Sequence, residues 1–67
     1  MTHYIYKNDI GRMKRLSIDR QFQNKDGKYH TTLWDCATGE WCGAAYLSEK
    51  ELQEHLDHYK NVRVEND

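Results

Sequence analysis

The sequence predicts one α+β domain, a four-stranded antiparallel β-meander packed on one C-terminal α-helix (ββββα). Three of the four glycines lie in turn-like segments, and these segments separate stretches that are rich in β-branched and aromatic residues. Towards the C-terminus, a single amphipathic stretch follows a helix-start signal. Because 67 residues leave room for only one hydrophobic core, residues 1–67 are expected to form a single domain.

Turn chemistry sets the limits of the expected strands. Asn8–Gly11, Asn24–Gly27 and Asp35–Glu40 are typical of tight connections, in which glycine supplies the positive φ that such turns need. The stretches between the turns have the composition of strands. We therefore expect strands at about residues 2–7, 12–23, 28–35 and 40–47.

The same turns predict how the strands align. If Gly11 closes the first turn, Tyr4 faces Leu16. The second turn places Ile18 opposite Trp34, and the third places Trp34 opposite Trp41. Because side chains alternate along a strand, this register predicts one apolar core face. Its residues are Tyr4, Tyr6, Leu16, Ile18, Phe22, Trp34, Trp41 and Ala45.

A helix at about residues 49–60 is expected to cover that face. Ser48 is a favourable N-cap, and Glu51 completes a capping box three residues later. Leu47 and Leu52 occupy the two positions of a hydrophobic staple at the same helix end. The local sequence therefore predicts where the helix begins.

An apolar stripe continues from that start. Leu52, Leu56 and Tyr59 recur at i, i+4 and i+7, which is the spacing of one helix face. Residues 61–67 are expected as a frayed tail or a short extension.

Two cysteines and two histidines are the candidate metal ligands. Cys36, Cys42, His55 and His58 resemble a Cys2His2 zinc finger in their order and in the twelve residues between Cys42 and His55. Five residues between the cysteines and two between the histidines depart from that family. The predicted register also makes the two thiols diverge, which argues against a disulfide. We expect no metal and no cofactor, with a zinc site at these four residues as the alternative.

No residue constellation indicates catalysis or a membrane span. The glycines are isolated turn formers and do not make a phosphate-binding loop. Asp35 and Glu40 pair only at an exposed hairpin tip. No apolar run approaches the ~20 residues of a spanning helix, and the first residues lack a signal-peptide core. We expect a non-enzymatic, cytoplasmic protein without membrane contact.

The sheet face away from the helix is the candidate binding site. The register predicts Tyr29 beside Tyr46 on this open face, with small apolar neighbours. The partner-binding residues predicted there are Arg15, Gln21, Tyr29, Thr31, Leu33 and Tyr46. A host protein or nucleoprotein complex is the expected partner, and a homodimer is a further option.

Charge is distributed unevenly along the chain. Residues 1–34 hold seven Lys and Arg against three Asp and Glu, whereas residues 35–67 hold three against eight. A basic half indicates that nucleic-acid phosphates are an alternative partner. The candidate nucleic-acid contacts are Lys7, Arg12, Lys14, Arg20, Lys25 and Lys28.

The segment Arg15–Tyr59, two hairpins leading into LSEKELQEHL, resembles two kinds of small domain in its arrangement. One is the small phage-encoded anti-CRISPR protein, a sheet with a helix that blocks a host complex. The other is the sheet-plus-helix DNA-binding domain at the N-terminus of some phage and transposon integrases. The first resemblance implies a phage or mobile-element inhibitor acting in the host cytoplasm. The second implies the alternative function, DNA binding through the open sheet face.

Overall fold

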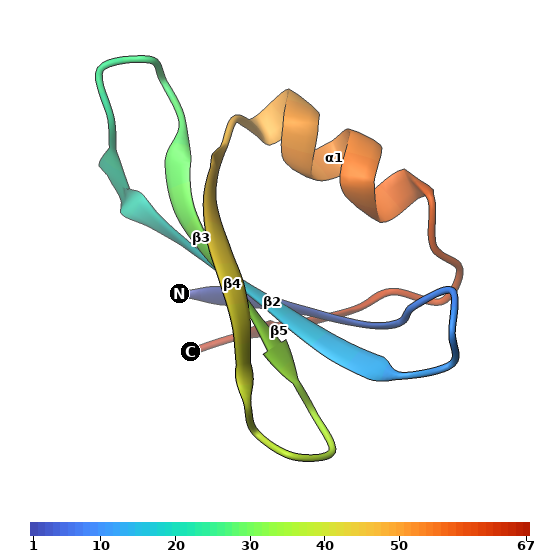
Figure 1. Ribbon diagram of the computed structural model, residues 1–67. Helices are drawn as coiled ribbons and strands as arrows, with labels where there is room; N and C mark the ends of the chain where they lie inside the picture. The colour runs from blue at the N-terminus through green and yellow to red at the C-terminus, as the bar shows by residue number, and fades with distance from the viewer.

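The computed structural model describes residues 1–67 as a five-stranded antiparallel sheet with one helix across one of its faces (Figure 1). The elements are β1 (Thr2–Lys7), β2 (Met13–Gln23), β3 (Tyr29–Asp35), β4 (Trp41–Leu47), α1 (Glu49–Asp57) and β5 (Arg63–Asn66). Their order across the sheet is β4-β3-β2-β1-β5. The α+β class is confirmed, and the four expected strands begin and end within one residue of the observed ones.

The last residues form a strand rather than a frayed tail. β5 pairs antiparallel with β1, with Val64 opposite Tyr4 and Arg63 opposite Ile5. The helix ends at Asp57, before the expected limit of residue 60, and Asn61 then adopts a positive φ of 57°. That left-handed residue lies between the helix and β5, where the chain turns back to the free edge of β1.

The helix begins where the local sequence predicts. The Ser48 hydroxyl accepts a hydrogen bond from the Glu51 backbone N–H at 3.1 Å, and the Glu51 carboxylate accepts one from the Ser48 backbone N–H, also at 3.1 Å. This reciprocal pair satisfies two backbone donors that a helix N-terminus otherwise leaves unpaired. The cap therefore fixes the point at which the chain leaves β4 to cross the sheet.

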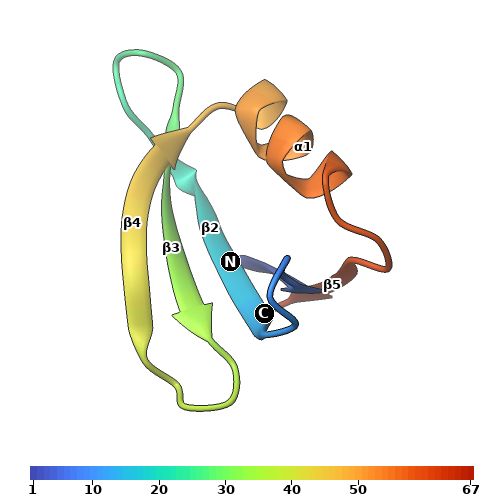
Figure 2. The same ribbon diagram turned by 45° about the vertical axis from the view of Figure 1, so that its right-hand side comes forward.

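The hydrophobic core lies between the helix and the sheet. Its buried members are Tyr6, Leu16, Ile18, Leu52 and Leu56. Partly buried side chains packed around them are Tyr4, Tyr29, Leu33, Leu47, Tyr59 and Val62. The helix covers one face only, and no element covers the opposite face of the sheet (Figure 2).

The predicted register of β1 with β2 is correct, whereas that of β2 with β3 is wrong. Tyr4 lies opposite Leu16, as expected. Ile18 lies opposite Thr31 instead of Trp34, because the pairing shifts between Ile18 and Gln23. Gln23 is five positions from Ile18, while their partners Tyr29 and Thr31 are two positions apart. A difference of three is odd, so every side chain of β3 lies on the face opposite to the expected one.

A second irregularity follows in β4. Trp34 lies opposite Trp41, as predicted, but Leu33 lies opposite Gly43 and leaves Cys42 as an extra residue. Such a bulge reverses the alternation once more. Ala45 therefore lies on the helix side, as expected, despite the error in β3.

Three aromatic residues assigned to the core lie outside it as a result. Phe22 is 72% exposed and Trp41 is 60% exposed. Trp34 is half-buried on the face away from the helix. Their places on the helix side are taken by Tyr29, Thr31 and Leu33.

Candidate binding face

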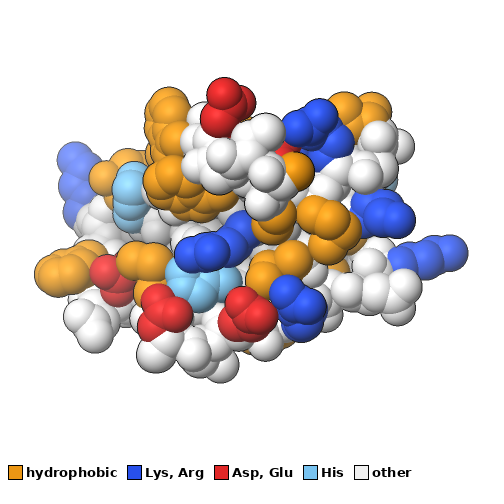
Figure 3. Space-filling view, turned by 90° about the horizontal axis from the view of Figure 1, so that it is seen from below, with side chains coloured by type: hydrophobic (Ala, Val, Ile, Leu, Met, Phe, Trp, Pro, Cys, Tyr) orange, Lys and Arg blue, Asp and Glu red, His pale blue; other side chains and the backbone are white.

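The helix-free side of the sheet, here called the open face, carries side chains in rows that run across the strands. One row crosses all five strands at a single level and consists of Arg63, Ile5, Arg15, Trp34 and Trp41. The next row consists of Glu65, His3, Ser17, Thr32 and Ala44. Hydrophobic, basic, acidic and histidine side chains are interleaved on this side (Figure 3).

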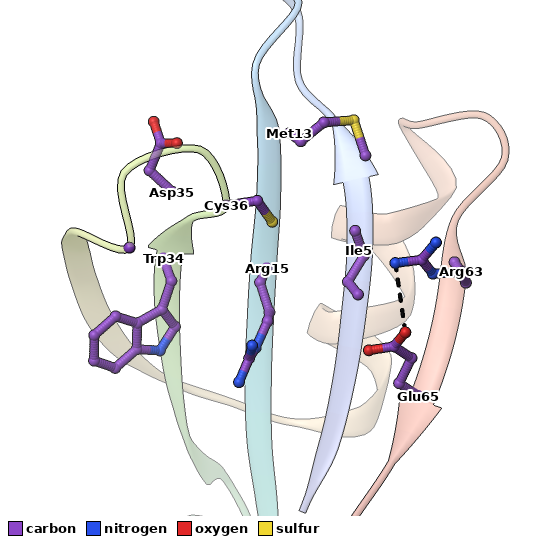
Figure 4. Close-up of a pocket in the computed structure, with 9 residues that line it drawn as sticks. Ile5, Met13, Arg15, Trp34, Asp35, Cys36, Arg63 and Glu65 are labelled. Carbon is purple, nitrogen blue, oxygen red and sulfur yellow. Dashed lines mark ion pairs between the residues drawn. The ribbon is translucent and has the colours of Figure 1, made fainter.

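Arg15 stands at the centre of the first row. Its side chain lies between those of Ile5 and Trp34, which come from the neighbouring strands (Figure 4). It is exposed and makes no ion pair or side-chain hydrogen bond, whereas Arg63 at the sheet edge pairs with Glu65 at 3.4 Å. A free guanidinium between apolar groups is therefore available to a ligand.

A hollow of about 580 Å³ surrounds this arginine. Four first-row residues line it, and the rest of its lining is Met13, Asp35, Cys36, Gly39 and Glu65. The hollow is a shallow depression of the face, formed where the β3–β4 hairpin rises beside β2 (Figure 4). Its walls combine apolar surface with opposite charges at the β5 edge, from Arg63 and Glu65.

Trp34 is held in a defined orientation. Its indole N–H donates a hydrogen bond of 3.0 Å to the Thr32 hydroxyl, two residues earlier on the same face. The ring therefore points along β3 towards the second row. Because its orientation is already fixed, binding a partner through this large apolar surface costs little further side-chain entropy. Such fixed aromatic rings are common anchors of binding surfaces.

The second row contains a hydrogen-bonded chain of serine, histidine and aspartate. His3 Nδ1 lies 2.6 Å from Ser17 Oγ, and His3 Nε2 lies 2.9 Å from Asp67 Oδ2. These residue types also form the triad of many hydrolases. Here Ser17 is only 5% exposed, and β2 pairs on both sides, so the neighbouring backbone N–H groups are engaged in the sheet. This series of hydrogen bonds fastens the C-terminal segment to the sheet. It lacks the pair of hydrogen-bond donors that would bind an oxyanion.

Tyr46 faces His30 rather than Tyr29. The rings of Tyr46 and His30 lie 5.4 Å apart on the open face, and Tyr46 is 55% exposed. Tyr29 lies on the helix side opposite Leu47 and packs against the core. The predicted tyrosine pair is therefore wrong: the bulge at Cys42 places Tyr46 opposite His30, and the register shift in β2 turns Tyr29 to the helix side.

Two of the six predicted partner-binding residues, Arg15 and Tyr46, lie on the open face. Tyr29, Thr31 and Leu33 lie on the helix side, and Gln21 lies in the irregular part of β2. The sequence reasoning missed Ile5, Met13, His30, Thr32 and Trp34 on the open face. The signal that was available is the unequal length of the two expected strands, 12–23 and 28–35, which indicates extra residues in the first.

The basic residues proposed as nucleic-acid contacts are mostly paired with carboxylates. Arg12 and Lys14 contact Asp35, at 2.6 and 3.4 Å. Arg20 pairs with Glu49, and Lys28 pairs with Glu51 at 3.1 Å. Only Lys7 and Lys25 of the six make no ion pair.

Asp35 is the strongest of these acidic partners. Its side chain is buried, and the hydrogen bond from Arg12 is the main reason that its pKa falls from 3.8 to about 2. Further hydrogen bonds from the Ala37 backbone N–H and from Lys14 act in the same direction. The carboxylate is thus charged at neutral pH and neutralises basic residues that a phosphate would otherwise meet.

The four candidate zinc ligands lie in different surroundings. Cys36 lines the hollow on the open face, and Cys42 lies 3.6 Å from the Lys14 ammonium. His55 is hydrogen-bonded to the Tyr6 hydroxyl, and His58 to Asp9. Both cysteines are free, and no group of three or more His, Cys, Asp or Glu side chains converges in the structure.

The fold and the open face define a small α+β protein whose single helix protects one side of a sheet. That helix has nine residues and lacks the length and apolar character needed to cross a bilayer. No protein-family model, no curated protein and no solved structure matches the chain.

Proposed function

We propose that this protein is a non-enzymatic binding module that holds a protein partner on its open face. The observation that carries the proposal is the row of Arg15, Trp34 and Trp41 beside the buried Ile5, in which the exposed guanidinium of Arg15 has no ion-pair partner. Aromatic residues, methionine and arginine are enriched at protein interfaces, and arginine and tryptophan are frequent energetic hot spots. This row and the adjacent Met13 supply all of these types.

The mixed charge of the face favours a protein over a nucleic acid. Asp19 lines a hollow of the open face together with Arg15, and Glu65 and Asp67 line the β5 edge of that face. A nucleic-acid surface gains affinity from lysines and arginines that are free to replace counterions along the phosphates. Acidic groups interleaved with the basic ones oppose that gain.

The chemistry around Arg15 indicates what the partner presents. A guanidinium flanked by apolar side chains binds a carboxylate in bidentate fashion, and exclusion of water by the neighbours strengthens the contact. The partner epitope is therefore an acidic side chain or a chain-terminal carboxylate within an apolar patch. Met13 and Trp34 contact that apolar surround.

The narrower hypothesis concerns the identity of the partner. A sheet face without a deep cavity suits occlusion of a partner surface better than capture of a small molecule. We therefore retain the proposal that the chain is a phage or mobile-element inhibitor of a host protein or nucleoprotein assembly. Addition of the purified protein to that assembly should reduce its activity in proportion to the amount bound.

The proposal is tested by affinity capture from the natural host, followed by titration of the captured protein with purified variants. Arg15→Ala and Trp34→Ala should each weaken binding at least ~30-fold, the effect of a hot spot of about 2 kcal/mol. Gln53→Ala, an exposed change on the helix, is the matched control and should bind as the wild type does. Equal binding by all three variants would contradict the proposed face. Salt-dependent binding to duplex DNA that persists in Arg15→Ala would favour the alternative of a DNA binder.

A further inference from the structure

β4 is an edge strand whose one protection against pairing is the bulge at Cys42, near its first residue. Its seven residues, Trp41–Leu47, include no charged side chain and no proline, and one of its edges has no neighbour (Figure 2). Natural edge strands are commonly shielded by charges, prolines or a covering segment. β5, at the other edge of the sheet, has only four residues and carries Arg63 and Glu65. The two edges therefore differ, and β4 is the one open to another strand.

We propose that β4 pairs antiparallel with β4 of a second copy of this chain, around a two-fold axis at Ala45. This dimer is independent of the partner on the open face. It joins two five-stranded sheets edge to edge and leaves both helices on one side and both open faces on the other.

The backbone limits which registers are possible. In an antiparallel pair of identical strands, both residues of each hydrogen-bonded pair turn their N–H and C=O groups towards the partner strand. Such residues are an even number of positions apart along one strand, so the two-fold axis passes through a residue position. The regular part of β4 is Gly43–Leu47, because the bulge at Cys42 interrupts the strand before it. An axis at Ala45 pairs all five of these residues. An axis at Ala44 extends the pairing across the bulge, and one at Tyr46 leaves part of the strand unpaired.

Side-chain sizes are complementary in this register. On the open face, Tyr46 of each copy lies opposite Ala44 of the other, so a large exposed ring meets a methyl group. On the helix side, Leu47 of each copy lies opposite Gly43 of the other. The space above Gly43 is open, since a Cβ placed there would meet no atom within 4 Å. Large residues thus face small ones at four positions of the interface.

A hollow beside Gly43 supports the same pairing. It measures about 290 Å³, lies on the helix side of β3 and β4, and is lined mainly by apolar groups that include Leu16, Leu33 and Leu47. The helix does not fill this space. Leu47 of the second copy, directly opposite Gly43, points to the same side of the sheet and covers the mouth of the hollow. Its burial there removes apolar surface from water in both copies.

Charges at the ends of the strand are complementary as well. Glu40 precedes β4, and Lys50, the second residue of the helix, follows it, so the antiparallel pairing brings Glu40 of one copy towards Lys50 of the other. Neither residue makes an ion pair within its own chain. The two-fold axis repeats this Glu40–Lys50 approach at both ends, and no like charges lie opposite each other within the paired strands.

The oligomeric state tests the proposal. Sedimentation equilibrium of the wild type over a range of concentrations should yield a species of twice the 8.1 kDa chain mass. Ala45→Lys places two ammonium groups opposite each other at the axis, and we expect the dimer dissociation constant to rise at least ~10-fold. Ala45 is exposed, so the variant should keep the circular dichroism spectrum of the wild type. Val64→Lys, an exposed change in β5, is the matched control and should leave the dimer intact.

A charge exchange gives a second, independent measurement. Glu40→Lys should weaken the dimer, and the double variant Glu40→Lys with Lys50→Glu should restore it. A wild type that stays monomeric at its highest soluble concentration overturns the proposal. A dimer that Ala45→Lys leaves intact, or that Val64→Lys dissociates, overturns the assignment of the interface to β4.

Discussion

The carboxylate of Asp35 lies 2.6 Å from Nη2 of Arg12, and this ion pair fastens the end of β3 to the beginning of β2. The same carboxylate accepts a hydrogen bond of 2.9 Å from the Ala37 backbone N–H within the β3–β4 turn. One buried acidic side chain thus stabilises both the turn and its attachment to the neighbouring hairpin. The hollow beside Arg15 depends on this arrangement, because Cys36 and Gly39 of the same turn form part of its wall.

The Asp35–Arg12 pair predicts how stability changes in acid. The pKa of Asp35 is lowered from 3.8 to about 2, chiefly by the hydrogen bond from Arg12, so folding favours the charged form. The contribution of the Asp35 carboxylate to the free energy of unfolding is complete above the pKa of Asp35 in the unfolded chain. It is lost as the pH falls through about 2. Asp35→Asn should therefore lower the free energy of unfolding at pH 7. It should also remove part of the fall in that free energy between about pH 4 and pH 2. Urea midpoints of both proteins across this range would measure the difference; parallel pH profiles would contradict the assignment.

The helix cap predicts the effect of a change far from the open face. Ser48→Ala removes the acceptor for the Glu51 backbone N–H and should lower the free energy of unfolding by about 0.5–2 kcal/mol. Ser48→Asp retains an acceptor at the same place and is the matched control. Urea unfolding compares the two variants with the wild type. If the alanine variant is as stable as the aspartate variant, the cap contributes nothing measurable.

A half-buried histidine on the helix predicts a second pH effect. Burial, and secondarily the charge of His58, lowers the pKa of His55, whose ring is hydrogen-bonded to the Tyr6 hydroxyl at 3.0 Å. Tyr59 also packs against this ring. Folding thus favours neutral His55, and stability should fall as the pH drops below its unfolded pKa of about 6.5.

The corresponding experiment compares two glutamine variants. His55→Gln should flatten the decline of the free energy of unfolding between about pH 7 and pH 5, because the group that gains a proton on unfolding is gone. His58→Gln, at an exposed position, should retain most of the decline. Thermal melts at several pH values measure both. A decline that is unchanged in His55→Gln would show that another group is responsible.

Local chemistry predicted the parts of the fold that depend on neighbours in sequence. The capping box at Ser48 and Glu51 and the limits of four strands follow from short-range rules, and the structure agrees with them. The face assignment of β3 failed because it required counting residues through β2, where three extra residues lie between Ile18 and Gln23. Side chains alternate between the two faces of a sheet, so a register error of an odd number of residues places every following side chain on the wrong face.

Two other differences have equally specific causes. Gly43 was available as a sign of irregularity, since glycine inside a strand often marks a bulge. β5 was missed because Arg63–Asn66 is short and fully exposed, so its strand character depends on pairing with β1 rather than on an apolar pattern. The candidate site was predicted on the helix-free face of the sheet, yet all three of its β3 residues, Tyr29, Thr31 and Leu33, lie on the helix side because of the reversal.

The reversal leads to the last prediction, which separates a core residue from a binding residue. Ile18 is fully buried beneath the helix, whereas Trp34 lies half-buried on the open face. Ile18→Ala should lower the free energy of unfolding by about 2–5 kcal/mol, because it leaves a cavity in a small core. A domain of this size has only ~3–5 kcal/mol to lose, so this variant should be largely unfolded at 37 °C.

Trp34→Ala should behave in the opposite way. The ring contacts Thr32 and its open-face neighbours but not the core cluster, so its loss should leave the fold and the cooperative melt in place. Partner binding should fall sharply, since the half-buried indole is the largest apolar group next to Arg15. Melting curves and binding titrations on the two variants give four measurements. The assignment of Ile18 to the core and of Trp34 to the open face predicts all four. A folded Ile18→Ala beside an unfolded Trp34→Ala would place Trp34 in the core and overturn the register observed between β2 and β3.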